Sequence, residues 1–213
     1  MAINQSEQLF LEVHDTPTFA FATSAVSIAE QAWADQIISG EESVDRLFNP
    51  QDAEQLFAEM KRANGVLGRW VGVLAIADDA ETRGVVGYGW STETYGASHA
   101  ARIGRAVAHK IGWPNTEPEV HVNQLNTLPR YQRRGVGHAV LGQLMREHDG
   151  DRAVSVQTPS GFLYPHTWFK RAGFKPDEQT VESQESLRLT SRVEKIREHV
   201  RLRPSIADGI WRT

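Results

Sequence analysis

The residues with the clearest capacity for chemistry lie in the stretch LPRYQRRGVGHAVL, which spans Leu128–Leu141. Three arginines precede a Gly-Val-Gly turn, and an apolar helical pattern follows it. The unpaired amides of a helix N-terminus bind phosphate, and glycines let an anion approach the backbone without interference from a Cβ atom. Arginine adds charge and forked donors that suit phosphate oxygens. The stretch therefore predicts an anion-binding loop, while each arginine taken alone could equally be an ordinary surface residue.

Two common nucleotide-binding motifs do not account for this stretch. A P-loop requires the string GxxxxGK[ST], which the sequence does not contain. A dinucleotide-binding fingerprint requires GxGxxG, but Val140 stands where the third glycine belongs. What remains is a strand, a short turn, a pair of glycines and a helix.

The pattern Q-x-x-G-x-G at 132–137 resembles the pyrophosphate loop of the GNAT superfamily of acyl-CoA-dependent N-acyltransferases. Pro129 precedes it by three residues, as is common in that family, and a strand-like segment ends just before it. Downstream, WFKRAGF at Trp168–Phe174 is similar to the family's second motif, in which an aromatic residue is followed four positions later by Gly-Phe. One helix and one strand separate the two motifs, so the resemblance covers roughly residues 119–175.

The resemblance implies a particular way of holding acyl-CoA. In this family the fourth and fifth strands separate, and the pantetheine arm lies between them like an additional strand. Carried onto this chain, the co-substrate is acetyl-CoA, and the backbone of Leu125, Asn126 and Thr127 contacts the pantetheine. The residues implied to hold the pyrophosphate are Gln132, Arg133, Arg134, Gly135, Val136, Gly137 and His138. The amine then attacks the thioester directly, with no metal and no covalent enzyme intermediate, which suits a chain without cysteine.

Such a reaction needs a base that takes the proton of the amine. His121 is the candidate, because it lies eleven residues before Gln132, where other members of the family carry a histidine or glutamate base. The ordinary pKa of histidine, ~6.5, also suits proton transfer at neutral pH. A purely structural histidine is the open alternative. Glu119 and Asn123 share its face if the strand is regular, and a bulge would change that assignment.

The acid for the departing thiolate is where the sequence departs from the family pattern. Many relatives carry tyrosine at the aromatic position of the second motif, but this chain has Phe169, which has no proton to donate. Tyr164, five residues earlier on the same expected helix, is a substitute candidate, with a core or surface tyrosine as the alternative. The asparagine that often follows the fifth strand is also missing. A non-catalytic acyl-CoA-binding or partner-binding module is therefore the alternative to an N-acetyltransferase.

Alternating aromatic and acidic residues on the expected third strand could hold a cationic amine. The candidates for this substrate-binding role are Tyr88, Trp90 and Glu93, with Tyr95 following them. Packing of the same aromatic residues into the core is the open alternative. The acceptor is expected to be a small-molecule or peptide amine, and the family resemblance does not select among such amines because one fold serves many of them.

Bulk composition excludes several classes of protein. The 213 residues carry 23 Lys and Arg against 27 Asp and Glu, and a net charge of −4 argues against a nucleic-acid partner. The absence of cysteine excludes disulfide frameworks and thiol nucleophiles, and it fits a cytoplasmic protein. The start lacks the pattern of a signal peptide, and the longest apolar run, Trp70–Ala77, is far shorter than the ~20 residues of a membrane span. No membrane partner is expected, and a homodimer is left open.

These residues require a mixed α/β scaffold to position them. Alternating apolar runs predict an antiparallel hairpin at 69–78 and 83–95, and strands alternate with helices from residue 119 onward. The expected fold is a mostly antiparallel mixed sheet flanked by helices, in a single GNAT-like domain over 1–213. Its expected divisions are acceptor-side elements at 1–118, an acyl-CoA-binding core at 119–175, and late strands with a charged tail helix at 176–213.

Three further elements are expected in the N-terminal half. Pro17–Ala25 is expected as a strand and Val26–Ser39 as a helix. A second helix is expected to begin with Asn49 as its N-cap and to end before Gly65. A helix at Ala97–Trp113 is longer than the tight turn that the family usually has there, and it could shape the acceptor mouth or an oligomer contact.

Overall fold

The computed structural model describes most of the chain as strands and helices. It covers residues 8–38, 52–65, 69–78, 83–94, 107, 110–112, 118–159, 163–177, 186–201 and 210–212. The strands it describes are β1 (Gln8–His14), β2 (Trp70–Asp78), β3 (Arg83–Thr94), β4 (Glu119–Thr127), β5 (Ala153–Pro159), β6 (Lys175–Pro176), β7 (Ser186–Arg192) and β8 (Ile210–Arg212). The helices are α1 (Phe19–Ile38), α3 (Ala53–Gly65), α5 (Val136–Arg146), α6 (Leu163–Arg171) and α7 (Val193–Arg201), with a short 3-10 helix, η1 (Pro129–Tyr131).

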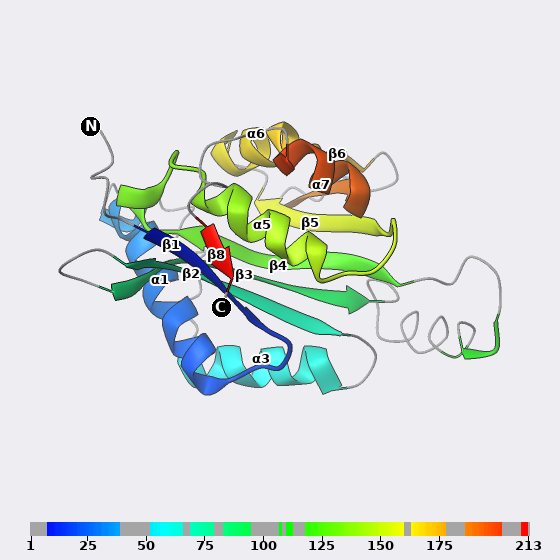
Figure 1. Cartoon of the computed structure of the whole chain (residues 1–213), viewed down its shortest axis with the longest axis horizontal. Coiled ribbons are helices and arrows are strands. Elements are labelled where there is room, and N and C mark those ends of the chain that lie inside the picture. Colours follow the sequence, from blue (N-terminus) through cyan, green and yellow to red (C-terminus); the bar gives the residue numbers. More distant parts are fainter. Residues whose placement is uncertain are drawn as a thin grey trace.

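All of these strands join one sheet in the order β6-β7-β5-β4-β3-β2-β1-β8. β4 and β5 pair in parallel, as do β1 and β8, and the other pairs are antiparallel. Parallel neighbours cannot be joined by a tight turn, so the chain crosses from β4 to β5 through α5. This arrangement confirms the expected mixed, mostly antiparallel sheet flanked by helices (Figure 1).

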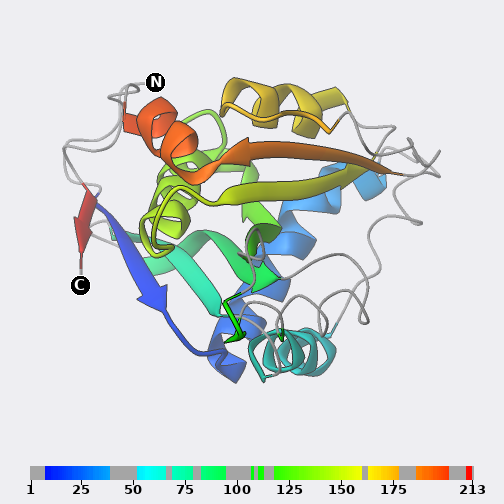
Figure 2. The ribbon, with the colours of Figure 1, turned by 90° about the vertical axis from the view of Figure 1, so that its right-hand side faces the viewer.

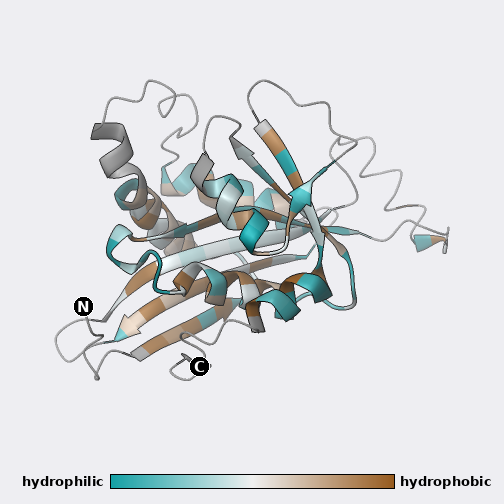
Figure 3. Cartoon of the chain, turned by 90° about the horizontal axis from the view of Figure 1, so that it is seen from above, coloured by the Kyte–Doolittle hydropathy of each residue, from teal (hydrophilic) through white to brown (hydrophobic). Residues whose placement is uncertain are grey.

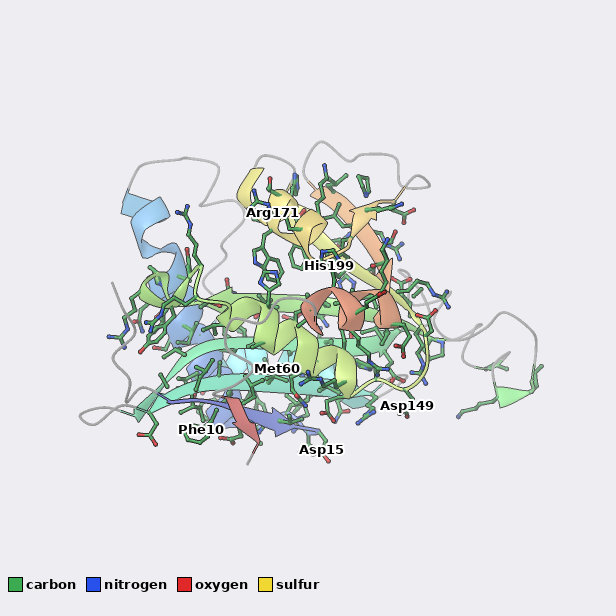
Figure 4. The ribbon with its side chains drawn as sticks, turned by 45° about the horizontal axis from the view of Figure 1, so that its top comes forward. Phe10, Asp15, Met60, Asp149, Arg171 and His199 are labelled. Carbon is green, nitrogen blue, oxygen red and sulfur yellow. The ribbon has the colours of Figure 1, made fainter. Side chains whose placement is uncertain are left out.

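Helices cover both faces of the sheet. α1 and α3 lie on one face, and α5 and α7 lie on the other with α6 beside them (Figure 2). The labelled residues of Figure 4 mark these layers, because Met60 belongs to α3 whereas Arg171 and His199 belong to α6 and α7. We call the two faces of the sheet the α1 side and the α5 side.

The central strands are packed against apolar side chains on both sides. On the α1 side, Phe21 meets Trp70 and Tyr88 edge-on, with ring centroids 5.2 and 6.4 Å apart. On the α5 side, glycine at position 89 lets α5 approach β3 closely, since a Cβ atom there would lie 2.8 Å from Cγ1 of Val140. Hydrophobic and hydrophilic residues alternate along the flanking helices (Figure 3). The close packing of α5 fixes where its N-terminus lies relative to β4.

The N-terminal part of the chain folds differently from the sequence expectation. Pro17–Ala25 is not a strand, because α1 already begins at Phe19. The Thr18 hydroxyl accepts a hydrogen bond from the Phe21 amide over 3.1 Å, and this N-cap starts the helix. The first strand is instead β1, in the preceding segment. A short apolar run fits a strand or a buried helix face equally well, and here the cap decides between them.

The remaining elements follow the sequence more closely. The predicted hairpin is confirmed as β2 and β3. α3 is capped by Asp52, whose Oδ1 accepts from the Gln55 amide over 2.7 Å, while the predicted cap Asn49 lies outside the described residues. The predicted helix at 97–113 also lies outside them, except for 107 and 110–112. None of the helices that the structure describes is long and apolar enough to span a membrane.

Candidate active site

The strands β4 and β5 separate after a short paired stretch. Among the described residues they pair at three positions, which are Val120 with Val154, His121 with Ser155 and Val122 with Val156. Beyond these positions β4 stays paired with β3 as far as Thr127, and β5 stays paired with β7 as far as Pro159. The carboxyl halves of the two strands therefore diverge, and their facing edges can accept an extended chain by strand addition.

A bulge interrupts β4 at the point where it leaves β5. The register between β3 and β4 pairs Trp90 with Gln124 but Ser91 with Val122. Asn123 is therefore an extra residue on β4, and the alternation of side chains shifts by one position after it. The bulge lies at the mouth of the divergence, where it changes which side chains share a face.

Three neighbouring side chains of β4 project to the α1 side as a result: His121, Asn123 and Gln124. His121 lies opposite Thr92 of β3, and Asn123 Nδ2 donates to Thr92 Oγ1 over 3.0 Å. Gln124 Oε1 accepts a hydrogen bond of 3.0 Å from the hydroxyl of Tyr88, which also faces α1. The bulge thus gathers an imidazole and two amides on one face.

His121 is tied to the neighbouring strand β5. Its Nδ1 lies 2.9 Å from Oγ of Ser155, a residue that is 1% exposed. Two positions earlier on β4, Glu119 forms an ion pair with Arg188 of β7, whose Nη2 lies 2.6 Å from Glu119 Oε1. Arg188 Nε also lies 3.5 Å from Asp177 Oδ2. The half-buried imidazole therefore has a polar neighbourhood in which two carboxylates share one guanidinium.

The loop between β4 and α5 takes a conformation that presents backbone amides. Gly135 has φ of 88° and is the N-cap of α5, and no described side chain caps the helix. Arg133 also has a positive φ, 59°, which is uncommon for residues other than glycine. The first amides of a helix have no partner within the helix. Gln132 Nε2 donates to the Thr127 carbonyl over 3.3 Å, which ties this loop to the end of β4.

Tyr131 holds two arginine side chains beside this loop. Its ring is 7% exposed, and the guanidinium carbons of Arg130 and Arg134 lie 5.1 and 4.9 Å from the ring centroid. Such cation–π contacts hold the positions of otherwise flexible side chains. Positive charge is therefore concentrated next to the N-terminus of α5.

The first turn of α5 is covered by an indole from α6. A Cβ atom built on Gly137 would lie 3.3 Å from Cζ2 of Trp168 and 3.5 Å from Cδ2 of Leu125. The rings of His138 and Trp168 also pack together, with centroids 4.8 Å apart. A side chain at position 137 would fill the space where β4, α5 and α6 meet. Because residue 137 is glycine, the backbone of this turn is not covered by a side chain of its own.

Solved structures share the fold of this chain. The chain superposes on the paia N-acetyltransferase of Thermoplasma acidophilum, solved in complex with coenzyme A, with a TM-score of 0.53 and 11% identity over 85% of this chain and 98% of that one. An acetyltransferase from Thermus thermophilus gives 0.54 and 13% over 85% and 97%. A protein of Desulfovibrio desulfuricans that is assigned to the GNAT family of acetyltransferases gives 0.53 and 15% over 86% and 99%. The chain has the GNAT fold.

This GNAT fold is reached by a divergent sequence. No family model matches the chain, and no curated protein matches it significantly. At most 15% of the aligned residues are identical in the three structures above. The likeness therefore lies in the arrangement of elements.

Within the GNAT fold of this chain, the residues expected to hold acetyl-CoA lie close together. Leu125 to Thr127 form the end of β4, and residues 132–138 form the loop and the first turn of α5. The hydrogen bond from Gln132 to the Thr127 carbonyl joins the two segments. The side chain of Asn126 points elsewhere, because its Nδ2 donates to the Tyr88 hydroxyl over 2.9 Å.

Two of the residues expected to bind the acceptor, Tyr88 and Trp90, lie inside the core. Each is 1% exposed, and they donate to Gln124 Oε1 over 3.0 and 3.2 Å. Burial raises the pKa of the Tyr88 phenol, and the hydrogen bond with Asn126 offsets this only in part. Both side chains therefore hold Gln124 in place as hydrogen-bond donors.

Glu93, the third of these residues, lies on the opposite face from His121. Its Oε1 lies on the α5 side, 3.1 Å from His148 Nδ1 and 2.5 Å from Arg152 Nη1. His148 Nε2 in turn lies 2.8 Å from the Ser91 hydroxyl. Burial raises the pKa of Glu93, but the hydrogen bond from His148 and the contacts with Arg152 outweigh it and lower the pKa from 4.5 to about 2. The structure thus separates Glu93 from the face that carries the imidazole of His121.

Glu93 is expected to make the protein lose stability in acid. Its folded-state pKa lies below its ordinary value, so its contribution is complete above pH 4.5 and is lost as the pH falls toward about 2. A Glu93→Gln variant should melt at a lower temperature than wild type at neutral pH, and its Tm should fall less on acidification. Thermal melts followed by circular dichroism across this range measure both effects. Glu12→Gln, at a side chain that is 43% exposed, is the control, and equal acid-induced drops in all three proteins would contradict the expectation.

The aromatic position of the second motif is filled by a core residue. Phe169 is 8% exposed and packs edge-on against Trp168 and Phe174, with centroids 4.9 and 5.3 Å away. Tyr164 falls in the first turn of α6, and its side chain lies outside the part of the chain that the structure describes.

Three residues of this site are missing from the sequence-based set: Gln124, Ser155 and Trp168. Ser155 is found only once the register of β4 against β5 is known, and Gln124 only once the bulge is located. A signal for Trp168 was present, because it directly precedes Phe169 in the second motif. Neighbours on a helix point about 100° apart, and here Phe169 enters the core while Trp168 packs against His138 of α5.

Proposed function

We propose that this chain is an N-acetyltransferase that moves an acetyl group from acetyl-CoA to an amine. The observation that carries the proposal is the position of His121 relative to the separating strands β4 and β5 and to the N-terminus of α5. β4 parts from β5 one residue after His121, and the N-terminus of α5 begins at Gly135 shortly beyond the end of β4. The shared fold supports the proposal, since the paia N-acetyltransferase of Thermoplasma acidophilum was solved in complex with coenzyme A.

The residues present fit the phosphates and the pantetheine of acetyl-CoA. Backbone amides of 133–138 would bind the pyrophosphate at the positive end of α5, and the arginines on Tyr131 would add charge. Glycine at 137 suits this cradle, because a Cβ atom there would crowd Trp168. The backbone of 125–127 would add hydrogen bonds along the pantetheine. Bound acetyl-CoA supplies an activated thioester, whose carbonyl carbon the amine attacks.

His121 would take the proton from the attacking amine. It lies on the α1 side at the divergence of the strands, with one ring nitrogen held by Ser155. Asn123 and Gln124 lie next to it and would orient the acceptor through hydrogen bonds. Positioning the amine and removing its proton are the two contributions that such a reaction needs from the protein.

The acceptor is proposed to be a small-molecule or peptide amine that approaches from the α1 side. Glu119 and Asp177 place two carboxylates on that side and share the single charge of Arg188. These carboxylates would attract a cationic amine toward His121. Tyr88 and Trp90 would contribute indirectly, by holding Gln124.

The departing sulfur would receive little help from the second motif. Phe169 is packed in the core and carries no proton to give. Tyr164 is the remaining side-chain candidate for the acid, on its position in α6 alone. A thiol is far more acidic than an alcohol, with about 8.5 as the ordinary pKa of cysteine, so a thiolate is a good leaving group that water can protonate.

Release of free CoA that depends on an amine tests the proposed function. Purified protein is mixed with acetyl-CoA and a panel of small and peptide amines, and the free thiol and the acetylated product are measured. We expect a rate that requires both the protein and an amine. Acetyl-CoA binding without such release across the panel would instead support the alternative, a non-catalytic acyl-CoA-binding or partner-binding module.

A further inference from the structure

The contact between His121 and Ser155 joins β4 and β5 just before the two strands separate. The two residues are direct neighbours in the parallel ladder, and His121 Nδ1 lies 2.9 Å from Ser155 Oγ. Ser155 is 1% exposed, so bulk water does not compete for its hydroxyl. We propose that Ser155 is a positioning residue that fixes the tautomer and the ring orientation of His121, an inference that rests on the proposed function of His121 as the base.

The direction of this hydrogen bond decides whether His121 can act as a base. A neutral imidazole carries its proton on one nitrogen and accepts a proton only on the other. When Nδ1–H donates to the serine oxygen, Nε2 is the nitrogen that takes the proton from the amine. When the serine hydroxyl donates to Nδ1 instead, Nε2 already holds the proton of the neutral ring and cannot take another from the amine. In the proposed arrangement, Ser155 Oγ accepts the hydrogen bond from Nδ1–H of His121.

The same contact holds in both protonation states of the ring. Once Nε2 has taken the proton, the imidazolium still donates from Nδ1 to Ser155 Oγ, so the ring need not turn during the reaction. The proton then passes from Nε2 to the departing sulfur or to water, which restores the neutral base. An acceptor at Nδ1 also stabilises the charged form, and this raises the basicity of Nε2.

The backbone around His121 is held as firmly as its ring. Asn123 Nδ2 donates to the His121 carbonyl over 3.2 Å as well as to Thr92 of β3. The charged groups that form ion pairs near His121 on this face include Glu119 of β4, Arg188 of β7 and Asp177 after β6. Both carboxylates pair with the guanidinium, and Nδ1 of His121 contacts the neutral hydroxyl of Ser155.

The tautomer of His121 can be measured without any activity. Long-range 15N–1H correlation spectra distinguish the two neutral forms, and a His121→Gln variant assigns the signals. We expect the Nδ1-protonated form to predominate in the wild-type protein and a mixture of forms in Ser155→Ala. A wild-type His121 protonated on Nε2 overturns the inference, and it does so whether or not acetyl transfer is found.

A pH–rate profile provides the second readout. Ser155→Ala is expected to lower kcat about tenfold and to move the acid limb to lower pH, because the imidazolium loses its acceptor. Ser155→Thr keeps the hydroxyl and should restore most of the rate. Ser191→Ala, which removes a hydroxyl that donates to the Gly173 carbonyl over 2.8 Å, is the control and should leave the profile unchanged.

The positioning role of Ser155 and the acetyl transfer itself are tested by different results. A Ser155→Ala profile identical to that of wild type overturns the positioning role while acetyl transfer stands. Absence of amine-dependent CoA release in the wild-type protein overturns the proposed function, and the tautomer measurement then still decides the direction of the contact between His121 and Ser155.

Discussion

A Gly137→Glu variant is expected to lose affinity for acetyl-CoA by at least about a hundredfold, which corresponds to about 2.8 kcal/mol. A Cβ atom at this position would already lie 3.3 Å from Trp168 and 3.5 Å from Leu125, so the longer side chain must displace one of them or enter the loop. In the loop its carboxylate would oppose the phosphates of acetyl-CoA. Isothermal titration of CoA into the wild-type and variant proteins measures the effect.

The matched control for this variant is Gly84→Glu. A Cβ atom at position 84 has nothing within 4 Å, at the exposed start of β3, so the same substitution meets no neighbour there. We expect wild-type affinity and wild-type Tm from this control. A Gly137→Glu protein that melts like wild type and binds CoA equally well would show that the loop before α5 does not hold the co-substrate.

The second large effect is expected from His121→Ala. Loss of a general base should lower kcat by about 10²- to 10³-fold near neutral pH. The loss should shrink as the pH rises, because the amine then releases its proton to solvent unaided. KM for acetyl-CoA should change little, since the loop and the diverging strand edges remain. Steady-state rates measured with the best amine of the panel, across neutral to alkaline pH, give this comparison.

His199→Ala controls for loss of an imidazole elsewhere in the fold. His199 lies on α7, away from the α1 side (Figure 4), and its removal should leave the pH profile unchanged. A His121→Ala protein with the rate and pH profile of wild type would remove His121 from the base role. Acetyl transfer itself would then require another proton acceptor on the same face.

The sequence predicted those elements in which two independent signals agreed. β2 and β3 combine β-branched residues with a polar break between them. The start of α5 is indicated by the glycine pair, and the apolar pattern after it indicates the helix. The N-terminal expectation was wrong, because Pro17–Ala25 has an apolar run that fits two structures. The hydrogen bond between Thr18 and the Phe21 amide selects the helix, and a sequence pattern cannot weigh such a cap against β propensity.

The parts of the candidate site that depend on local backbone conformation could be predicted from the sequence. The parts that depend on the register between neighbouring strands could not. The loop and helix start at 132–138 could be predicted because glycine positions and helix starts are local properties, and the role of these residues in holding acetyl-CoA stays a prediction. Ser155 and Gln124 depend on how β4 pairs with its neighbours, which involves residues more than thirty positions apart in sequence. Glu93 was expected beside Tyr88 and Trp90, but alternation along β3 places it on the α5 side with His148.

The most direct test of the central claim is a map of the backbone amides that respond to CoA. In 15N–1H spectra of deuterated wild-type protein titrated with CoA, the largest shift changes are expected at 133–138, with further changes at 123–127 where β4 leaves β5. Gly84 should not move. Saturable shifts confined to other parts of the chain, or no shifts at millimolar CoA, would contradict the account.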